Sequence, residues 1–505
     1  MGGALHSVRK FLWGEKPSTK EEQRLLNKID AVVLSFLCLQ YLSNYLNRAN
    51  FANAYVTGMR EDLGFKGTQY NQVNTVFTIG YIVGQLPNAL ILQFVPPRIW
   101  LPFCGIVWGG LSACTAAAKT PQHVMAIRFF QAIFESSTFS GSHWVLGCWY
   151  KESELGKRSG IFATAAQFGQ LFSGVMQGRI ATTMEGHHGL HSYQWLFIID
   201  CCIAIPIAIF GFIMFPDTPR STKAWFLTEE ERQLAIARLP EKGKTKMSWD
   251  LIKRVLGRWH WYGFSALFGI SALLESVGIN GIMGLWFQYL KFEVSKRNYY
   301  PLSLISVAIV ITLICATWTD HTGKRWPVNI FMAATLTFCS ILLLIWDIPY
   351  GLKFFALALS GAGYAGQATN FAWANIVCRH DDQERAVVLY SMNMWSNVVI
   401  AWWGIVLFPA TSAPKFRNGW IGTIVVAFLT VIIALVCRHL DNKERREERQ
   451  QMQGEEGVVS RERSKEGTEE DEKKIGFGSS ESEDKGLDQV LHTDQKVVLS
   501  SLEKE

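Results

Sequence analysis

The sequence predicts an all-α membrane protein with about twelve transmembrane helices in two pseudo-symmetric halves of six. The first observation is that hydrophobic residues make up 49% of the 505 residues and fall into runs long enough to span the ~30 Å hydrocarbon core of a bilayer. The second is an internal repeat. The charge-alternating loops 151–158 and 379–385 lie six helices apart, as do loops 96–100 and 319–327. A soluble chain of this length would instead divide into several domains.

The first half is expected to hold six helices after a basic arm. We expect an arm at 1–28, helices at about 29–58, 70–94 and 100–118, a fourth helix that ends near residue 150, and helices at about 158–181 and 194–215, which makes the half 29–215. The first helix surrounds Arg48 with asparagines at near-helical spacing. The second contains Gly84 and Pro87, residue types found where membrane helices approach closely or kink. The sixth carries Asp200 in its first turns.

A charged segment is expected to separate this half from the second. Residues 216–260 are charged and helix-prone, and they form the largest internal loop. The second half, 261–437, is expected to hold helices at about 261–290, 301–319, 327–346, 352–377, 385–408 and 418–437. Residues 438–505 are charged and nearly free of aromatic side chains, so we expect a disordered tail.

The distribution of charge predicts the orientation of the chain. Basic residues are concentrated in the arm and in the central loop, whereas the loop between the fifth and sixth helices has no Lys or Arg. Positive charge favours the cytosolic side, so both termini and the central loop are expected in the cytosol. No cleavable signal peptide is expected, because roughly the first 30 residues are polar.

Cysteine and charge content exclude several other classes. The ten cysteines lie mostly inside apolar runs and form no CxxC pair, so we expect neither a disulfide framework nor a metal site. No cofactor is indicated. The net charge of +6 needs no nucleic-acid partner, because the basic residues gather in particular loops that face lipid head groups.

Two opposite charges lie inside the fourth predicted helix. An ionisable side chain at the centre of a membrane helix costs at least ~2.5–3.5 kcal/mol, so it normally faces a cavity or a partner. Arg128 and Glu135 are about two turns, or ~10 Å, apart and share one face. That separation leaves room for a small anion beside the arginine. The alternative is that these groups only make polar contacts between helices.

The loop after the eighth predicted helix reads TDHTGKRWP and matches the D-x-x-G-K/R-K/R signature of the major facilitator superfamily, whose plan is two six-helix halves around a midplane site. Gly323 permits a tight turn, and Asp320 can cap a neighbouring helix. We expect these contacts to hold one gate shut. The residues expected to act in gating are Asp320, Gly323, Lys324 and Arg325 in this loop, with Arg158 and Arg385 in the repeated charged loops.

Longer segments make the resemblance more specific. NYLNRANFANAYVTGMREDLGF, RFFQAIFESSTFSGSHWVLGCWYKESELGKRSGIF and QERAVVLYSMNMWSN resemble the fungal anion:cation symporter family, in its allantoate-permease-like branch. Within that family, YQWLFIID, RVLGRWHW and GYAGQATNFAWANIVC resemble plasma-membrane pantothenate–proton symporters of yeasts. The resemblance covers about 25–440 and leaves out both tails.

The resemblance implies roles for three charged residues. Arg48 and Arg128 would contact the substrate carboxylate or organise the pocket, and Glu135 would carry the proton. Asn47 stands where many members of the family have an acid. Because Asn47 cannot titrate, we expect one proton per monoanion, and therefore electroneutral transport, unless Asp200 or Glu275 contributes.

Pantothenate has a carboxylate, an amide and two hydroxyls, so its pocket needs a cation, hydrogen-bonding side chains and apolar walls. A planar guanidinium suits the carboxylate. The remaining substrate-binding candidates are Asn44, Gln170, Tyr364, Gln367, Asn370, Asn393 and Asn397, with Trp286 and Trp395 as further walls. Each of these could equally serve helix packing.

Three alternatives remain open on the sequence. The substrate could be another carboxylate, such as biotin, nicotinate or allantoate. A nutrient sensor that binds without transport is a different class, and the long tail gives it modest support. An enzyme is not expected, because no nucleophile–base pair or His-rich metal set recurs in the apolar runs. The tail segment SSESEDK suggests kinase or ubiquitin machinery as partners.

Overall fold

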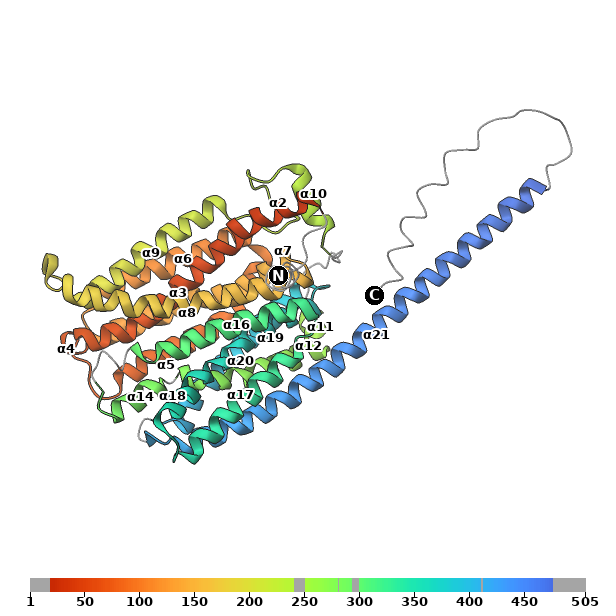
Figure 1. Cartoon of the computed structure of the whole chain (residues 1–505). Coiled ribbons are helices and arrows are strands. Elements are labelled where there is room, and N and C mark those ends of the chain that lie inside the picture. Colours follow the sequence, from red (N-terminus) through yellow and green to blue (C-terminus); the bar gives the residue numbers. More distant parts are fainter. Residues whose placement is uncertain (1–18, 240–249, 280, 293–298, 410–411, 476–505) are drawn as a thin grey trace, which may run out of the picture. The chain divides into compact units, whose positions relative to one another are not determined.

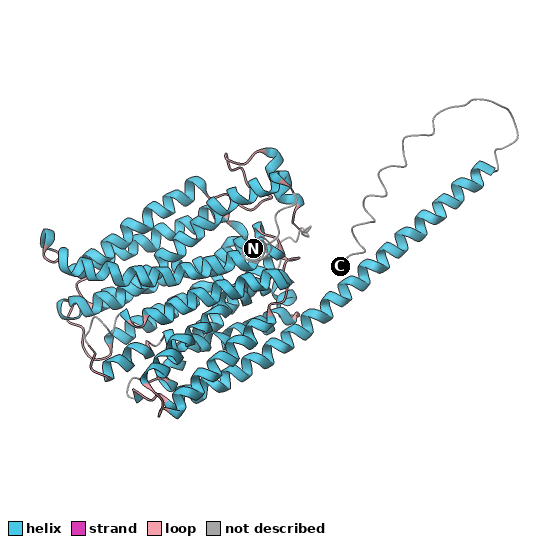
Figure 2. Cartoon of the chain, viewed as in Figure 1, coloured by secondary structure: helices cyan, strands magenta, loops and turns pink. Residues whose placement is uncertain are grey.

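The computed structural model describes residues 19–239, 250–279, 281–292, 299–409 and 412–475. Within these ranges the regular secondary structure is entirely helical, as the sequence predicts (Figure 2). Most of the expected N-terminal arm lies outside the described residues. The chain divides into one compact unit over Met1–Asp441 and a second over Asn442–Glu505, and the helices of the first unit are arranged as in Figure 1.

The first half contains the six expected spans, but the first begins at Lys20, nine residues before its predicted start at 29, and the fifth begins at Glu152, six residues before its predicted start at 158. The first span is a continuous run of α2 (Lys20–Ile29), η1 (Asp30–Leu34), α3 (Ser35–Ala54) and η2 (Tyr55–Met59); the others are α5 (Gln69–Phe94), α6 (Pro97–Ala116), α7 (Pro121–Trp149), α8 (Glu152–Thr183) and α9 (Ser192–Met214). Helix α7 begins where the hydroxyl of Thr120 accepts from the His123 amide at 3.3 Å and Pro121 occupies the first turn, both common helix-start features.

Two of the six spans in the second half contain a 3-10 turn between α-helical segments, which we call a break. The seventh span consists of α12 (Trp259–Ser271), η4 (Ala272–Glu275), α13 (Ser276–Ile279) and α14 (Ile282–Tyr289), and the tenth of α18 (Tyr350–Leu359), η5 (Ser360–Tyr364) and α19 (Ala365–Val377). The continuous spans are α16 (Leu302–Thr322), α17 (Trp326–Ile345), α20 (Asp382–Leu407) and the start of α21 (Arg417–Ile475). The sequence predicts continuous helices here, so these two breaks are a correction.

The breaks face each other because glycine lets the two backbones approach. Segments η4 and η5 are in contact. A Cβ atom added to Gly363 would lie 2.5 Å from the carbonyl oxygen of Leu274, which is closer than any side chain tolerates. Glu275, at the end of η4, lines a cavity.

Seven helices of the described chain are individually long and apolar enough to cross a membrane. The remaining spans are α7, α8 and α20, which are continuous but carry many polar residues, and the two broken spans. Short helices α10 (Glu229–Ala237) and α11 (Asp250–Leu256) lie in the central loop, in keeping with its helix-prone composition.

Helix α21 extends beyond the predicted end of the last span. It continues to Ile475, whereas the sequence predicts a disordered tail from residue 438. The added stretch is rich in Glu, Lys, Arg and Gln, which favour helix. The rest of the expected tail, 476–505, lies outside the described residues.

Helix pairs from both halves build one bundle. In the first half α5 packs on α7, α6 on α9 and α3 on α8, and in the second α12 packs on α20. The halves meet where α8 packs on α16 and α5 packs on α20. Close packing in the first half depends on Gly84, because a Cβ there would lie 2.8 Å from the Ile133 carbonyl oxygen.

Candidate functional site

A cavity of about 520 Å³ lies between the two halves, a size typical of small-molecule sites. Its lining comes from α3, α5, α7 and α8 on one side and from α12, η4, α13, η5, α19 and α20 on the other. Among the described lining residues, Arg48 is the one cation and Glu275 the one acid. The cavity is therefore lined by both halves, mixes polar and apolar side chains, and contains few charges.

Arg48 is positioned by an ion pair and by aromatic rings. Its Nε donates to the Glu135 carboxylate at 3.1 Å, and its guanidinium lies 4.5 Å from the ring centre of Tyr81. The side chain is 24% exposed and that of Glu135 is 0% exposed. The guanidinium thus faces the cavity on one side and a buried carboxylate on the other.

Gln131 occupies the space between Arg128 and Glu135, where the sequence predicts room for a small anion. Its Nε2 donates to Glu135 at 3.0 Å, and its Oε1 accepts from Arg128 at 3.5 Å. The expected gap between Arg128 and Glu135 is therefore filled by a side chain of the same helix. Gln131 follows Arg128 by three residues and precedes Glu135 by four, so helical spacing could have identified it.

Arg128 lies outside the cavity lining. Its guanidinium sits between the rings of Phe51 and Phe77, 4.5 and 4.6 Å from their centres, and donates to Asn47 at 3.2 Å. The expectation of direct substrate contact is not met by this geometry, because two aromatic rings and an amide occupy the faces of the guanidinium. The arrangement matches the other role that the resemblance implies, organising the pocket.

Asn47 connects these groups through a neutral amide. Its Oδ1 accepts from Gln131 at 2.6 Å and from Arg128, and its Nδ2 donates to Ser112 at 2.5 Å. An amide serves here because it must donate as well as accept, which a carboxylate cannot do. Asp200 belongs to a separate cluster, where it accepts from Asn50 at 2.6 Å.

The remaining expected substrate contacts divide into two groups. Five candidates line the cavity, namely Gln170, Tyr364, Gln367, Asn393 and Asn397. Asn44 and Asn370 do not. The Asn370 amide is engaged with Asn329 at 2.8 Å and with Ser271 at 3.2 Å, and Asn44 is 1% exposed. Periodicity identified polar helix faces but could not tell which of them meets the cavity and which meets another helix.

The aromatic walls also differ from those expected. Trp286 stacks on Tyr350 with ring centres 5.0 Å apart in the core of the second half, and Trp395 is 39% exposed. The rings that line the cavity are Tyr41, Tyr45, Tyr81, Phe139, Phe268 and Tyr364, of which the sequence analysis identified Tyr364 alone. Aromatic residues are too frequent in this chain, with 32 Phe and 19 Trp, for position in the sequence to single them out.

An aromatic floor closes one end of the cavity. Phe139 and Phe268, which line the cavity, both pack on Phe371, with ring centres 4.7 and 4.9 Å away. His143, one turn beyond Phe139 on α7, lies 4.6 Å from Phe371. We call the end of the bundle beyond this floor, which carries the loops 150–152, 322–326 and 378–382, the inner end.

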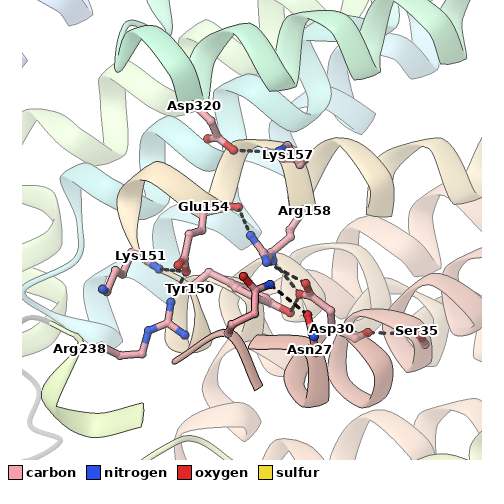
Figure 3. A network of polar contacts seen from close by, with 11 residues as sticks. Asn27, Asp30, Ser35, Tyr150, Lys151, Glu154, Lys157, Arg158, Arg238 and Asp320 are labelled. Atoms are coloured by element: carbon pink, nitrogen blue, oxygen red, sulfur yellow. Dashed lines mark hydrogen bonds and ion pairs between the residues drawn. The ribbon is translucent and has the colours of Figure 1, made fainter. Parts of the chain in front are cut away.

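At the inner end, the last turn of α16 and the loop after it hold the start of α8 (Figure 3). Asp320 accepts from the backbone amides of Gly156 at 2.8 Å and Lys157 at 2.6 Å, as the sequence predicts for a helix-capping acid. Gly323 has the positive φ of +65° that a tight turn needs. Arg325 donates to the Glu152 carboxylate at 3.1 Å and its carbonyl at 3.0 Å.

The other expected gating residues have different partners. Arg385 on α20 donates to the Gly147 carbonyl and the Cys148 sulfur of α7, both at 2.9 Å, so it joins the two halves. Arg158 instead pairs with Asp30 at 2.7 Å, a contact within the first half (Figure 3). The side chain of Lys324 is exposed and makes no hydrogen bond or ion pair among the described contacts.

One group of side chains has metal-ligand chemistry. His260, Cys378 and Glu384 place ligand atoms within 4.8 Å of one another, and these are donor types that zinc accepts. Glu384 already accepts from His260 at 2.8 Å and pairs with Arg258. The positive charge of a guanidinium on the same carboxylate disfavours binding of a divalent cation there. We therefore interpret these three side chains as a contact between α12, α20 and the end of α19.

Comparisons with known proteins agree with this architecture. Residues 37–404 match the Major Facilitator Superfamily. The chain is 44% identical over 450 residues to the pantothenate transporter FEN2 of Saccharomyces cerevisiae, covering 87% of this chain and 88% of that protein. It is 40% identical over 431 residues to the pantothenate transporter liz1 of Schizosaccharomyces pombe, covering 85% and 84%. The solved structure of the proton:xylose symporter XylE, bound to 6-bromo-6-deoxy-D-glucose, gives a TM-score of 0.63 at 14% identity over 80% of this chain and 94% of that one, a likeness of fold.

The buried ion pair predicts an unequal effect of single and double substitutions. Removing one partner of a buried pair costs about 3–5 kcal/mol, because the other charge stays buried and unpaired. We expect Arg48→Ala to lower the free energy of unfolding of the purified protein by about this amount. The double variant Arg48→Ala/Glu135→Gln is expected to recover most of the loss.

Thermal unfolding monitored by fluorescence-detected chromatography measures both variants, with the exposed Arg60→Ala as the matched control, expected within ~0.5 kcal/mol of the wild type. A double variant that is no more stable than Arg48→Ala would contradict the pairing.

Proposed function

Because this chain belongs to the major facilitator superfamily, we propose that it carries pantothenate into the cell by proton symport, in the plasma membrane and with both termini in the cytosol. It is a membrane transporter and not an enzyme. The observation that supports the substrate best, beside the pantothenate transporters to which the chain is similar, is Arg48. It is the one cation of the described cavity lining, held by an acid that can release it.

The cavity has a chemical counterpart for each part of pantothenate. The guanidinium of Arg48 suits the carboxylate. Gln170 and Gln367 on opposite sides, with Asn393 and Asn397 on α20, offer donors and acceptors for the amide and the two hydroxyls. Tyrosine and phenylalanine rings supply walls for the aliphatic part. We assign Asn44, Asn370 and Arg128 to the support of the site.

Coupling follows from competition for one guanidinium. With Glu135 ionised, its carboxylate holds Arg48 at 3.1 Å and the cavity offers an anion little net attraction. Protonation from the outside weakens that pair, and the substrate carboxylate takes its place. When the site faces the cytosol, Glu135 loses the proton, recaptures Arg48 and displaces the substrate. Gln131 and Asn47 keep the two side chains in position during the exchange.

The gate that we propose is at the inner end, which we assign to the cytosol. Asp320 and Arg325 from the second half hold the start of α8, and Arg385 holds the end of α7. Gly323 shapes the turn that brings Asp320 and Arg325 together. All of these contacts cross between the halves, so they must break when the halves rock apart on the cytosolic side. Arg158 stiffens the first half from within.

Two alternatives lead to different measurements. Biotin, nicotinate or allantoate as the substrate would compete with pantothenate uptake more strongly than pantothenate itself. A sensor would bind pantothenate without accumulating it. The proposal of kinase or ubiquitin machinery as partners rests on the composition of the tail segment 479–485, outside the described residues.

Uptake of labelled pantothenate into a yeast that lacks its own carrier tests the function. The wild type is expected to accumulate pantothenate by up to ~10-fold per unit of inward pH gradient for each coupled proton. Glu135→Gln is expected to abolish accumulation while leaving exchange of internal for external pantothenate, because a glutamine cannot release a proton. The exposed carboxylate Glu229, replaced by glutamine, serves as the control. Full accumulation by Glu135→Gln would show that Glu135 does not couple the proton.

The gate predicts increased reactivity of a buried thiol. Cys148 is 1% exposed at the contact between the halves. Loss of one charge-assisted contact costs about 1.5–3 kcal/mol, so Arg325→Ala or Asp320→Ala should speed alkylation of Cys148 about tenfold or more. Mass spectrometry of the Cys148 peptide after exposure to a membrane-permeant maleimide reports the rate. Lys324→Ala is the matched control; unchanged rates in all three variants would rule out this gate.

A further inference from the structure

Glu275 is an acid that the coupling described above does not use. It ends η4, at the break in the seventh span, and lines the cavity opposite Arg48. Its side chain is only 4% exposed, and one carboxylate oxygen accepts from Gln367 Nε2 at 2.7 Å. Among the described residues, no Lys, Arg or His nitrogen lies within 4.0 Å of it. A buried carboxylate without a cation is costly to keep ionised.

Apart from Arg48, the described cavity residues around Glu275 are uncharged. Its titratable neighbours are Tyr45 of α3, on the other half, and Tyr364 of η5, which packs beside η4. The lining residues of α20 are Asn393, Ser396, Asn397 and Ile400, those of α12 and α13 are Phe268 and Gly278, and α17 carries no charged side chain. The one cation of the lining, Arg48, is held by Glu135.

Counting charges shows what an entering anion meets. We count only Arg48, Glu135 and Glu275, because Arg128 lies outside the lining and keeps its charge in every state. With both glutamates ionised, these three groups contribute +1 and −2, which leaves −1. A pantothenate monoanion would then share an enclosed cavity with a second uncompensated carboxylate. With both glutamates protonated, Arg48 and the substrate balance to zero. One proton leaves Glu275 ionised beside the substrate, and the second removes that repulsion.

We propose that Glu275 is a second proton-binding site, so that two protons enter with each pantothenate and transport is driven by the membrane potential. The proposal rests on the proposed function and refines its stoichiometry. Each proton binds a carboxylate oxygen facing outside and leaves it facing the cytosol, and no covalent bond to the substrate changes. The loaded site crosses with zero charge and the empty site returns with −1, so each cycle moves one net positive charge inward.

This stoichiometry differs from the single proton that Asn47 implies. A neutral residue at position 47 removes an acid from the first half, and Glu275 supplies one from the second half, on the opposite wall of the same cavity. Asp200 is a further buried acid of the first half. It lies outside the lining and accepts from Asn50 of α3 at 2.6 Å.

Proteoliposomes containing the full-length purified chain test the proposal. The internal and external pH are kept equal, and an inside-negative potassium diffusion potential is imposed with valinomycin. For one net charge, a potential of ~100 mV supports about 50-fold accumulation of labelled pantothenate. The wild type is expected to accumulate pantothenate under this potential. Glu275→Gln is expected to lose that response and to keep accumulation driven by a pH gradient. Glu275→Asp and Asp200→Asn are expected to keep both.

Each other outcome has a definite meaning. A wild type that responds to the pH gradient but not to the potential overturns the second proton and leaves the proposed function standing. A wild type that responds to neither contradicts the proposed function itself. Loss of the voltage response in Asp200→Asn but not in Glu275→Gln overturns the assignment to Glu275. If Glu275→Gln does not fold, the ratio of protons to pantothenate taken up by the wild type decides: a ratio of two supports the proposal and a ratio of one overturns it.

Discussion

The ion pair between Arg48 and Glu135 is the constraint on which the rest of the site depends. Glu135 is fully buried and its partner Arg48 is 24% exposed to the cavity, with 3.1 Å between them. A largely buried pair is stable only if its remaining donors and acceptors are satisfied. Gln131 satisfies the second oxygen of Glu135, and Asn47 ties Gln131 to Arg128. A protein that needed only stability would do better with apolar side chains here, so the pair is best explained by what it does when it separates.

The contacts between the two halves determine from which side of the membrane the ion pair can be reached. Contacts of Asp320, Arg325 and Arg385 join the two halves at the inner end, and the aromatic floor around Phe371 lies between those contacts and the cavity. The floor is apolar and closes by packing, whereas the contacts beyond it are polar and can reform in water. A site built in this way can bind from one side while the other is shut, which is what alternating access requires.

Much of the fold and part of the candidate site could be predicted from the sequence, and the predictions that were wrong have physical causes. Long apolar runs indicate where the spans lie, because hydrocarbon thickness sets their length. The prediction of a disordered tail from residue 438 was wrong over the stretch to Ile475, since helix-forming residues extend α21. The breaks at η4 and η5 were missed, because glycine permits a break without requiring one. The pattern of charges singled out Arg48, which lines the cavity, and Glu135, which is buried behind it; their roles stay predictions. Arg128 lies outside the lining, since helical spacing tells which face a side chain occupies but not that Phe51 and Phe77 cover it.

The most direct test of the central claim is proton uptake when pantothenate binds to the purified protein. Calorimetric titration in two buffers of different ionisation enthalpy, repeated from pH 5 to 9, gives the number of protons taken up per substrate. If a substrate carboxylate displaces Glu135 from Arg48, binding at pH values where the empty site is ionised takes up at least one proton, and Glu135→Gln takes up one fewer. Binding of equal affinity at every pH, without proton uptake, would contradict the exchange of one carboxylate for another.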